Sequence, residues 1–212
     1  MAQMNNRTCV MRLSRYRNAL VRLRSLNFAR VFSENLADAV GVTATQVRKD
    51  FSLFGIKGNR RGGYAVDPLI GQINRVLGKD RVHKVVLAGA GNLGKALLGY
   101  PGFQASGIKI MAGFDIDPAE LQPDADVPVL PLEGMREYVR SHRIELGILA
   151  VPDSAAQQVM ELMVSAGIKG VLNFSPICLK GPAGCVVNNV NLVTEIENII
   201  YYVRAADRTG KH

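Results

Sequence analysis

Residues 83–94 read HKVVLAGAGNLG, and this stretch decides the fold of the larger part of the chain. Its first half is a largely apolar, β-branched run of the type buried in a parallel sheet. Its second half matches G-x-G-x-x-G directly after that strand and at the start of a helix, the context in which the motif binds a dinucleotide. We expect Gly89 to allow a tight turn, Gly91 to let the backbone approach a pyrophosphate at the helix N-terminus, and Gly94 to bring helix and strand together.

A carboxylate follows at the distance that this motif requires. Residues 108–114 (IKIMAGF) predict a second strand, and Asp115 follows it, 21 residues after Gly94. A carboxylate there accepts hydrogen bonds from the adenosine ribose. No Lys or Arg follows in Ile116-Asp117-Pro118, so a 2′-phosphate would meet two carboxylates and no cation. NAD(H) is therefore the expected cofactor rather than NADP(H), and the alternative is a strand–helix turn that holds no ligand.

Alternating strands and helices are predicted over the rest of the chain. Strands are expected at 127–130, 146–151, 170–174 and 186–190, helices at 133–142 and 154–166, and a final helix after residue 191. This alternation predicts an α/β fold with a doubly wound parallel sheet, a Rossmann domain, which binds ligands at the carboxyl ends of its strands. Val151, Pro152 and Asn173 lie at such ends and are further candidates for the cofactor site, with ordinary turn chemistry as the alternative.

The first third of the chain predicts a helix-turn-helix. Residues 10–26 carry apolar side chains at helical spacing, with arginines on the other face. Ser33 is expected to cap a helix that ends at Gly41, and Thr43 to cap the next helix, which ends at Gly55. Two short helices about a glycine turn are typical of a DNA-reading pair. The second helix carries Gln46, Arg48 and Lys49.

Residues 56–66 (IKGNRRGGYAV) combine three glycines with three basic side chains and predict a β-hairpin wing. Such a wing lays its basic tip against phosphates or into a minor groove. The alternative is a small helical bundle with a flexible basic loop. Asp67 is expected to cap a linker helix that closes at Gly78. The candidate DNA-binding residues of the helix pair and the wing are Ser33, Thr45, Gln46, Arg48, Lys49, Lys57, Arg60, Arg61 and Tyr64.

The charge of the chain is divided unevenly. Residues 1–81 hold 15 Lys and Arg against 5 Asp and Glu, whereas residues 82–212 hold 11 against 13. A basic module joined to a nearly neutral one indicates a nucleic-acid-binding surface beside a domain with another task. A basic domain that is merely soluble would have the same charge.

Composition excludes several classes of protein. Hydrophobic residues make up 48% of the chain and charged residues 21%, as in globular domains. No apolar stretch approaches the roughly 20 residues of a membrane span, and the first residues lack the apolar core of a signal peptide. Cys9, Cys178 and Cys185 form no C-x-x-C pair, which argues against a disulfide framework and a structural zinc. We therefore expect a cytoplasmic protein without a metal site.

The proton-transfer residues of a dehydrogenase are not evident. None of the six tyrosines has a lysine four positions later, and His83, His142 and His212 are poorly placed to serve a nicotinamide. The residues after Lys84 leave no room for a substrate domain. A binding module therefore explains the chain better than an enzyme. Two interpretations stay open at this point: a nucleotide-responsive DNA-binding regulator and a small NAD-dependent oxidoreductase.

Several stretches together make the chain similar to the Rex family of redox-sensing transcriptional repressors. They are RLSRY at 12–16, TATQVRKDFSLFG at 43–55, GGY at 62–64, GAGNLGKAL at 89–97, FDIDP at 114–118 and AGIKGVLNFSP at 166–176. The resemblance implies a homodimer that binds palindromic operator DNA when NADH is scarce and releases it when NADH binds. It also implies three parts: a winged helix-turn-helix over 1–81, a Rossmann domain over 82–191 and a dimerisation helix over 192–212 that the two copies exchange. Because Rossmann domains of this family are similar to CoA-binding ones, a CoA-binding module stays open as a third interpretation.

The resemblance also implies roles for individual residues. Arg12 and Tyr16 would face DNA, Asn92 and Leu93 would join the glycines at the dinucleotide, and Tyr100 would lie near the nicotinamide.

Two positions depart from the family pattern. Where relatives often carry an arginine and an aspartate, this chain has Asn18 and Asn191. A switch stabilised by that ion pair cannot operate unchanged here.

Overall fold

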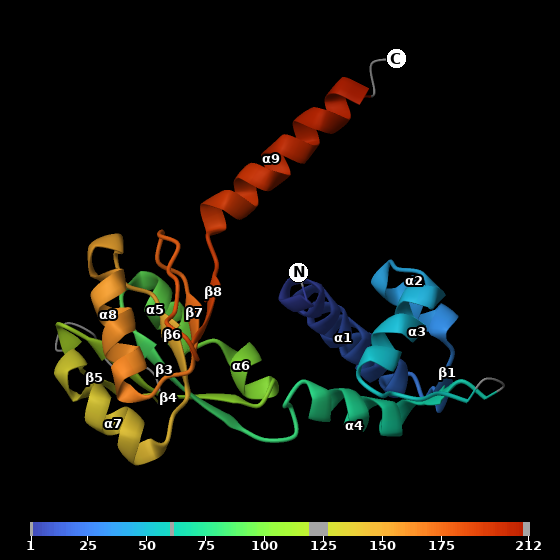
Figure 1. Cartoon of the computed structure of the whole chain (residues 1–212), viewed down its shortest axis with the longest axis horizontal. Coiled ribbons are helices and arrows are strands. Elements are labelled where there is room, and N and C mark those ends of the chain that lie inside the picture. The colour runs from blue at the N-terminus through green and yellow to red at the C-terminus, as the bar shows by residue number, and fades with distance from the viewer. Residues whose placement is uncertain (1, 60–61, 119–126, 210–212) are drawn as a thin grey trace. The chain divides into compact units, whose positions relative to one another are not determined.

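The computed structural model describes residues 2–59, 62–118 and 127–209, which form two compact units divided after Arg81 (Figure 1). Each unit has its own hydrophobic core. Within the described ranges, no helix is both long enough and apolar enough to cross a membrane.

The N-terminal unit is the winged helix-turn-helix that the sequence predicts. Its elements are α1 (Ala2–Ser25), β1 (Arg30–Val31), α2 (Ser33–Val40), α3 (Ala44–Leu53), β2 (Tyr64–Ala65) and α4 (Val66–Val76). The strands pair antiparallel, with Val31 opposite Tyr64. An antiparallel bridge between Asn59 and Gly63 closes the wing before β2. The predicted tip residues Arg60 and Arg61 lie outside the described residues.

Two of the predicted helix ends are confirmed. The Thr43 side-chain oxygen accepts the Gln46 amide at 3.1 Å and so caps α3. Gly41 ends α2 with a φ of +74°, a left-handed conformation that favours glycine.

Two predicted caps are wrong. Ser33 is the first residue of α2 rather than its cap, because the side-chain oxygen of Asn35 reaches back and accepts the Phe32 amide at 2.8 Å. Asp67 lies inside the first turn of α4, which begins at Val66.

The core of this unit forms because each helix contributes a stripe of buried side chains. Helix α1 begins well before the predicted start near Val10. Tyr16 and Phe51 meet edge to face with ring centroids 5.5 Å apart, and Phe51 and Tyr64 do so at 5.2 Å. Tyr64 therefore joins the wing to the core. The largest fully buried side chains of the unit are Leu13, Tyr16, Leu20, Leu36, Phe51, Leu69 and Ile73.

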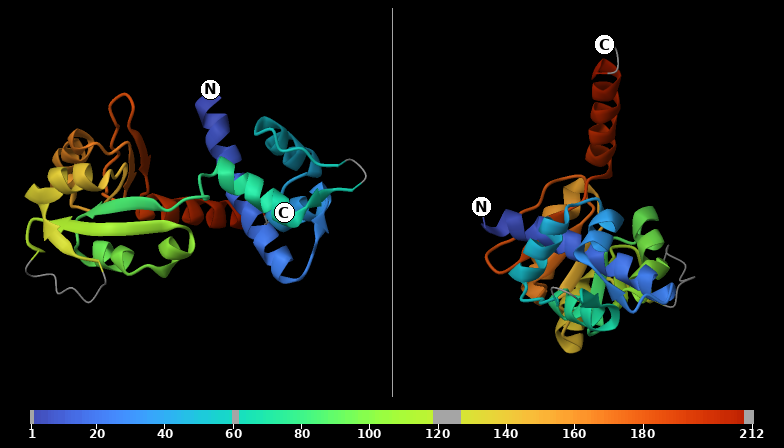
Figure 2. Two further views of the ribbon diagram at one scale, coloured as in Figure 1. Left: turned by 90° about the horizontal axis from the view of Figure 1, so that it is seen from below. Right: turned by 90° about the vertical axis from the view of Figure 1, so that its right-hand side faces the viewer.

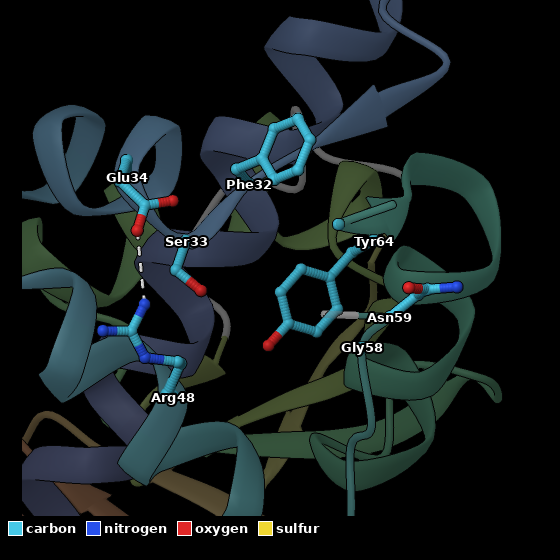
Figure 3. A pocket seen from close by; sticks show the side chains of 8 residues that line it. Phe32, Ser33, Glu34, Arg48, Gly58, Asn59 and Tyr64 are labelled. Carbon is cyan, nitrogen blue, oxygen red and sulfur yellow. Dashed lines mark hydrogen bonds and ion pairs between the residues drawn. The ribbon is translucent and has the colours of Figure 1, made fainter. Parts of the chain in front are cut away.

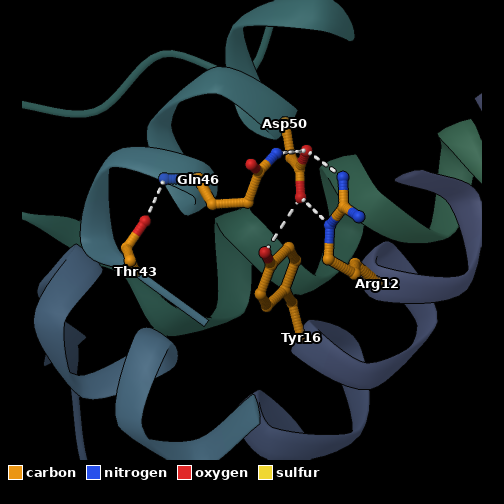
Figure 4. Close-up of polar contacts among 5 residues, drawn as sticks. All are labelled: Arg12, Tyr16, Thr43, Gln46 and Asp50. Atoms are coloured by element: carbon orange, nitrogen blue, oxygen red, sulfur yellow. Dashed lines mark hydrogen bonds and ion pairs between the residues drawn. The ribbon is translucent and has the colours of Figure 1, made fainter. Parts of the chain in front are cut away.

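A buried carboxylate links α3 to α1 (Figure 4). Asp50 is 3% exposed and accepts hydrogen bonds from Nε and Nη2 of Arg12 at 2.6 and 2.7 Å. It also accepts the Tyr16 hydroxyl at 2.9 Å and the Gln46 side-chain amide at 2.8 Å. Burial raises the pKa of Asp50, but these donors outweigh burial and lower it from 3.8 to about 2. Asp50 therefore stays ionised and ties the two helices together.

The C-terminal unit is built on a six-stranded parallel sheet. Its strands are β3 (His83–Ala88), β4 (Ile108–Asp115), β5 (Val129–Pro131), β6 (Leu146–Leu149), β7 (Gly170–Asn173) and β8 (Val186–Asn189), in the order β5-β4-β3-β6-β7-β8. The order reverses between β3 and β6, where sheets of this kind bind ligands. The predicted doubly wound Rossmann sheet is confirmed.

Helices cover both faces of this sheet. Helices α5 (Asn92–Leu98) and α6 (Pro101–Ala105) lie below the strands in the left view of Figure 2, and α7 (Met135–His142) and α8 (Asp153–Ala166) lie above them. The 3₁₀ helix η2 (Leu132–Gly134) leads into α7. Alternate side chains of β3 serve the two faces: Val86 and Ala88 belong to the cluster of α7 and α8, and Val85 and Leu87 to the opposite cluster.

Two apolar surfaces of this unit stay open to solvent in the described part of a single chain. The chain between β7 and β8 forms no helix, and Leu146, Ile148, Leu172 and Val186 help to line an apolar depression of about 440 Å³ on the sheet. The last helix, α9 (Leu192–Thr209), is the second surface. Its exposed apolar side chains are Leu192, Val193, Ile196, Ile199, Ile200, Tyr201, Tyr202 and Val203.

Replacing Asp50 should loosen the N-terminal unit in a pH-dependent way. Asp50→Asn leaves Arg12 without its counter-charge, so the free energy of opening α1 and α3 should fall by about 3 kcal/mol at neutral pH. Because the pKa of Asp50 is lowered in the folded state, its stabilisation is complete above the ordinary value of 3.8 and is lost as the pH falls towards about 2. Peptide-resolved hydrogen exchange on the full chain measures the difference between the variant and the wild type.

Tyr16→Phe is the matched control, because it removes one neutral donor and keeps the ring. Its expected loss is about 1 kcal/mol. Equal losses in the two variants, or an Asp50→Asn deficit that does not shrink in acid, would contradict this account.

Candidate functional site

A cavity of about 480 Å³ lies at the carboxyl ends of β3, β4 and β6, where the strand order reverses. It is lined by Gly89, Gly91, Leu93, Phe114, Asp115, Ile116, Leu132, Ala150, Val151, Pro152, Ala155, Val159 and Phe174. Most of these side chains are apolar, and a carboxylate and a glycine loop lie among them. Such a cavity suits a flat aromatic ligand that carries a polar sugar.

The three glycines of the loop differ in the space around them. Gly89 has a φ of +89°, and a Cβ there would lie 2.4 Å from the carbonyl oxygen of Ala150. At Gly94 a Cβ would lie 1.9 Å from the carbonyl oxygen of Gly89. Gly89 therefore lets the loop approach the chain after β6, and Gly94 lets α5 approach the loop. At Gly91 a Cβ would meet nothing within 4 Å, so the space beside this residue is open to a ligand.

The Asp115 carboxylate lines the cavity and holds the glycine loop. One of its oxygens accepts the Ala90 amide at 2.6 Å, and the other accepts the Asp117 amide at 3.2 Å. Carboxylate oxygens have more than one acceptor site, so both keep capacity for a further donor. The end of β4 and the loop after β3 are thereby joined beside the cavity.

The cavity is lined by some of the predicted cofactor residues and by several residues that the sequence pattern does not predict. Leu93, Val151 and Pro152 line it, as do Gly89, Gly91 and Asp115. The lining residues that were not predicted are Phe114, Ile116, Leu132, Ala150, Ala155, Val159 and Phe174. Most of them follow the carboxyl ends of strands or belong to the first turn of α8. Parallel sheets bind ligands at the carboxyl ends of their strands, so these positions could have been predicted from the expected strands.

Asn92 and Tyr100 are not brought to this cavity within the chain. Asn92 is exposed on α5 and does not line it. Tyr100 packs edge to face on Phe103 at 5.2 Å and lines a separate depression of about 750 Å³ with Tyr138.

Asn173 corrects a prediction, because its side chain does not face the cavity. It is fully buried, and its nitrogen donates to the Ile177 carbonyl and to Asn189 Oδ1, both at 2.8 Å. Its oxygen accepts the Ser175 amide at 2.9 Å. The Ser175 hydroxyl in turn donates to the Val151 carbonyl at 2.8 Å. Asn173 therefore holds the loop after β7 against the edge of the cavity.

In the N-terminal unit, the outer face of α3 presents exposed polar side chains. Thr45, Arg48 and Lys49 are all exposed, and so is Lys57 at the base of the wing. Arg48 Nη1 donates to Glu34 Oε1 at 3.2 Å, and Arg48 Nη2 donates to Thr45 Oγ1 at 3.4 Å.

A second cavity, of about 510 Å³, opens between α2, α3 and the wing (Figure 3). Its lining residues are Phe32, Ser33, Glu34, Arg48, Gly58, Asn59, Gly63 and Tyr64. Figure 3 shows the hydroxyl groups of Ser33 and Tyr64 in the space beside Arg48. Hydroxyl and guanidinium donors of this kind suit phosphate oxygens.

Three side chains that were predicted to face DNA are turned inward instead. Tyr16 is fully buried, so the expectation that it contacts DNA is wrong. Arg12 and Gln46 direct their donors to Asp50. The cause is the buried carboxylate, which requires several donors to stay ionised in the core.

Asn18 and Asn191, the two residues that depart from the family pattern, have hydrogen-bond partners close in sequence. Asn18 Oδ1 accepts Nη1 of Arg17 at 3.4 Å. Asn191 Oδ1 accepts the amides of Val193 and Thr194 at 3.0 and 3.2 Å and so caps α9. In the described residues, no group of three or more His, Cys, Asp or Glu side chains is arranged to hold a metal ion.

Two protein-family models match the chain. Residues 7–52 match the model described as "Putative DNA-binding protein N-terminus", and residues 80–177 match the model described as "CoA binding domain".

Similar proteins cover almost the whole chain. The "Redox-sensing transcriptional repressor Rex" of Clostridioides difficile (strain 630) is 37% identical over 196 residues, which are 92% of this chain and 93% of that protein. The protein of the same name from Desulforamulus reducens is 40% identical over 193 residues, 91% of this chain and 92% of that protein.

Solved structures of RSP, described as a Rex-family repressor, are also similar. Its complex with β-NAD⁺ and operator DNA has a TM-score of 0.89 at 34% identity and covers 96% of this chain and 94% of that chain. Its complex with β-NADH has a TM-score of 0.83 at 33% identity and covers 96% of both chains.

The glycine geometry predicts that the same substitution has a large effect on stability at one position and almost none at another. Gly94→Ala should destabilise the C-terminal unit by about 3 kcal/mol, because the new methyl group overlaps backbone. Gly91→Ala should change its stability by less than about 0.5 kcal/mol, because the methyl group enters open space. Calorimetric unfolding of the full chain measures both. A stable Gly94→Ala protein would contradict the close approach of α5 to the loop.

Proposed function

The chain belongs to the Rex family of redox-sensing transcriptional repressors, and from this premise we propose that it binds operator DNA as a homodimer and releases it when NADH binds. One observation carries the proposal: a basic winged helix-turn-helix and a Rossmann cavity with an open glycine loop occur in one chain. The relatives are named as transcriptional repressors. In this proposal the N-terminal unit binds DNA, and the nucleotide that binds in the cavity of the C-terminal unit controls that binding.

The cavity in the C-terminal unit supports binding of NAD(H). The open space at Gly91 fits a pyrophosphate that approaches the backbone, and Asp115 is available to the adenosine ribose. Asp117 adds a second negative charge close by, which disfavours a 2′-phosphate and hence NADP(H). Leu93, Val151 and Pro152 supply apolar contacts for the rings.

Asn92 and Tyr100 were assigned to the dinucleotide by resemblance alone. Neither lines the cavity of a single chain, and Tyr100 lines a separate depression.

The exposed face of the N-terminal unit supports binding of DNA. Arg48 and Lys49 lie on the outer face of α3. They are proposed to contact base edges and phosphates when α3 lies in the major groove. Thr45 is exposed beside Arg48, and the buried Ser33 and half-buried Tyr64 line the cavity between α2, α3 and the wing. All three are proposed to hold phosphates through their hydroxyl groups. Lys57, Arg60 and Arg61 complete the proposed basic surface through the wing.

The exposed apolar helix α9 supports a homodimer. Ile196, Ile200 and Val203 follow one another at helical spacing and are each at least 46% exposed. Helix α9 and the bare apolar face of the sheet are surfaces that a second copy would bury. A dimer would also present two copies of α3 to the two halves of a palindromic operator.

The protein is proposed to act in the cytoplasm, where operator DNA and the nicotinamide pool are both found. The match of residues 80–177 to the CoA binding domain supports coenzyme A as an alternative ligand of the same cavity. Competition between coenzyme A and NADH for the protein distinguishes the two ligands.

Asp115 should contribute to nucleotide affinity through the ribose. Asp115→Asn keeps an oxygen for the Ala90 amide but loses the charge, so NADH should bind about 5–150-fold more weakly, which corresponds to roughly 1–3 kcal/mol. Asp117→Asn is the matched control, because it removes the same charge from a residue that does not line the cavity. Isothermal titration calorimetry measures both. The ribose assignment fails if the two variants bind NADH equally well.

NADH should weaken operator binding. The expected change in operator affinity at saturating NADH is about 5–150-fold, and operator DNA must weaken NADH binding by the same factor. NAD⁺ should have a smaller effect, because its charged ring enters the same apolar pocket. A duplex selected from random sequences by the wild-type protein is the probe, and electrophoretic mobility shift is the measurement. Gly91→Ala should bind that duplex but lose the response. Unchanged operator affinity in wild type with saturating NADH would refute the proposed function.

A further inference from the structure

A carboxylate lies inside the cavity that the proposed function assigns to phosphate. Glu34, in the first turn of α2, lines this cavity together with Ser33, Arg48 and Tyr64 (Figure 3). The carboxylate repels a phosphate placed there, which lowers the affinity for every DNA sequence alike. The unit around it is otherwise basic, with 15 Lys and Arg against 5 Asp and Glu over residues 1–81. A contribution to DNA affinity therefore does not explain why a glutamate lies in this cavity.

A contribution to the folding stability of the N-terminal unit does not explain the presence of Glu34 either. The side chains of Arg48 and Glu34 are 53% and 64% exposed, and an ion pair this exposed contributes little to folding. Asp38 lies on the same helix and is also exposed. Among the described residues it makes no side-chain hydrogen bond or ion pair.

The contacts of the Arg48 side chain restrict the orientation of its guanidinium group. Arg48 is held at Nη1 by Glu34 from α2 and at Nη2 by Thr45 from the preceding turn of α3. Two contacts on different nitrogens fix the plane of a guanidinium, which otherwise samples many rotamers. The remaining N–H groups stay available to a base edge, where an arginine in a fixed plane binds guanine with two parallel hydrogen bonds.

We propose that Glu34 is a positioning residue that sets the sequence preference of α3: it orients the Arg48 guanidinium for a base edge and keeps it and the adjacent cavity from binding any phosphate indiscriminately. The inference rests on the proposed DNA-binding function and goes beyond it, because it gives an acidic residue a part in DNA recognition. Glu34 lowers the affinity for DNA in general, and the same contact raises the discrimination between sequences.

Two matched substitutions separate this role from a general effect of charge. Glu34→Ala and Asp38→Ala each remove one negative charge from α2, but only the first releases Arg48. The full-length protein is titrated with two duplexes, one selected from random sequences by the wild type and one of scrambled sequence. Asp38→Ala should strengthen binding to both duplexes by a common factor and leave their ratio unchanged. Glu34→Ala should strengthen binding to the scrambled duplex further and reduce the ratio by at least about fivefold.

Two further variants keep the test decisive. Glu34→Met keeps most of the volume of the side chain but removes the oxygen that accepts Arg48, so it should also reduce the ratio, and the test does not depend on the folding of the alanine variant. In an Arg48→Ala background, Glu34→Ala should no longer change the ratio, because the residue acts through Arg48.

The inference is overturned if both Glu34 variants keep the wild-type ratio, if Asp38→Ala reduces it equally, or if the effect persists without Arg48. A wild-type protein that binds the two duplexes equally would instead refute the proposed function, and the inference with it.

Discussion

The ionised carboxylate of Asp50 is the constraint on which the N-terminal unit depends. A charge in an apolar core must be surrounded by donors, and here they come from α1, 34 and 38 positions away in sequence, and from the preceding turn of α3. Helix α3 cannot rotate about its axis without breaking these bonds or exposing Val47 and Phe51. The inner face thus fixes which side chains the helix presents outward. The orientation of Arg48 and Lys49 follows from a carboxylate that they do not touch.

The cavity of the C-terminal unit is also held in shape by specific contacts. Here the contacts are made mainly by backbone atoms. Gly94 allows α5 to approach the carbonyl oxygen of Gly89 closely, and Asp115 ties the end of β4 to the amide of Ala90. The loop is therefore held on two sides before any ligand arrives. A cavity held in this way loses little conformational entropy when it binds a ligand. Asn173 extends the same support to the loop after β7 through bonds to buried backbone.

Local patterns predicted the fold and part of the site, because the glycine motif, the alternation of strands and the turn at Gly41 depend on neighbouring residues. Long-range contacts account for most of the rest. Arg12 and Tyr16 belong to a motif of the family, and their inward orientation depends on a residue far along the chain. Ser33 resembles a helix cap, but Asn35 provides the contact. Asn173 lies at the end of a strand like a ligand-binding residue, yet its partner Asn189 belongs to another strand. No periodicity encodes such partners.

In the proposed homodimer, the bare apolar face of α9 would make the protein dependent on its own abundance. A helix that exposes this much apolar surface is more stable in water when another surface covers it. Where a second copy provides that surface, as proposed, the free energy of the folded state includes a term in protein concentration. At low copy number, newly made chains stay alone for longer and offer that surface to chaperones and proteases. The number of working molecules then rises more steeply than the rate of synthesis. Small changes in expression are amplified before any ligand or DNA is involved.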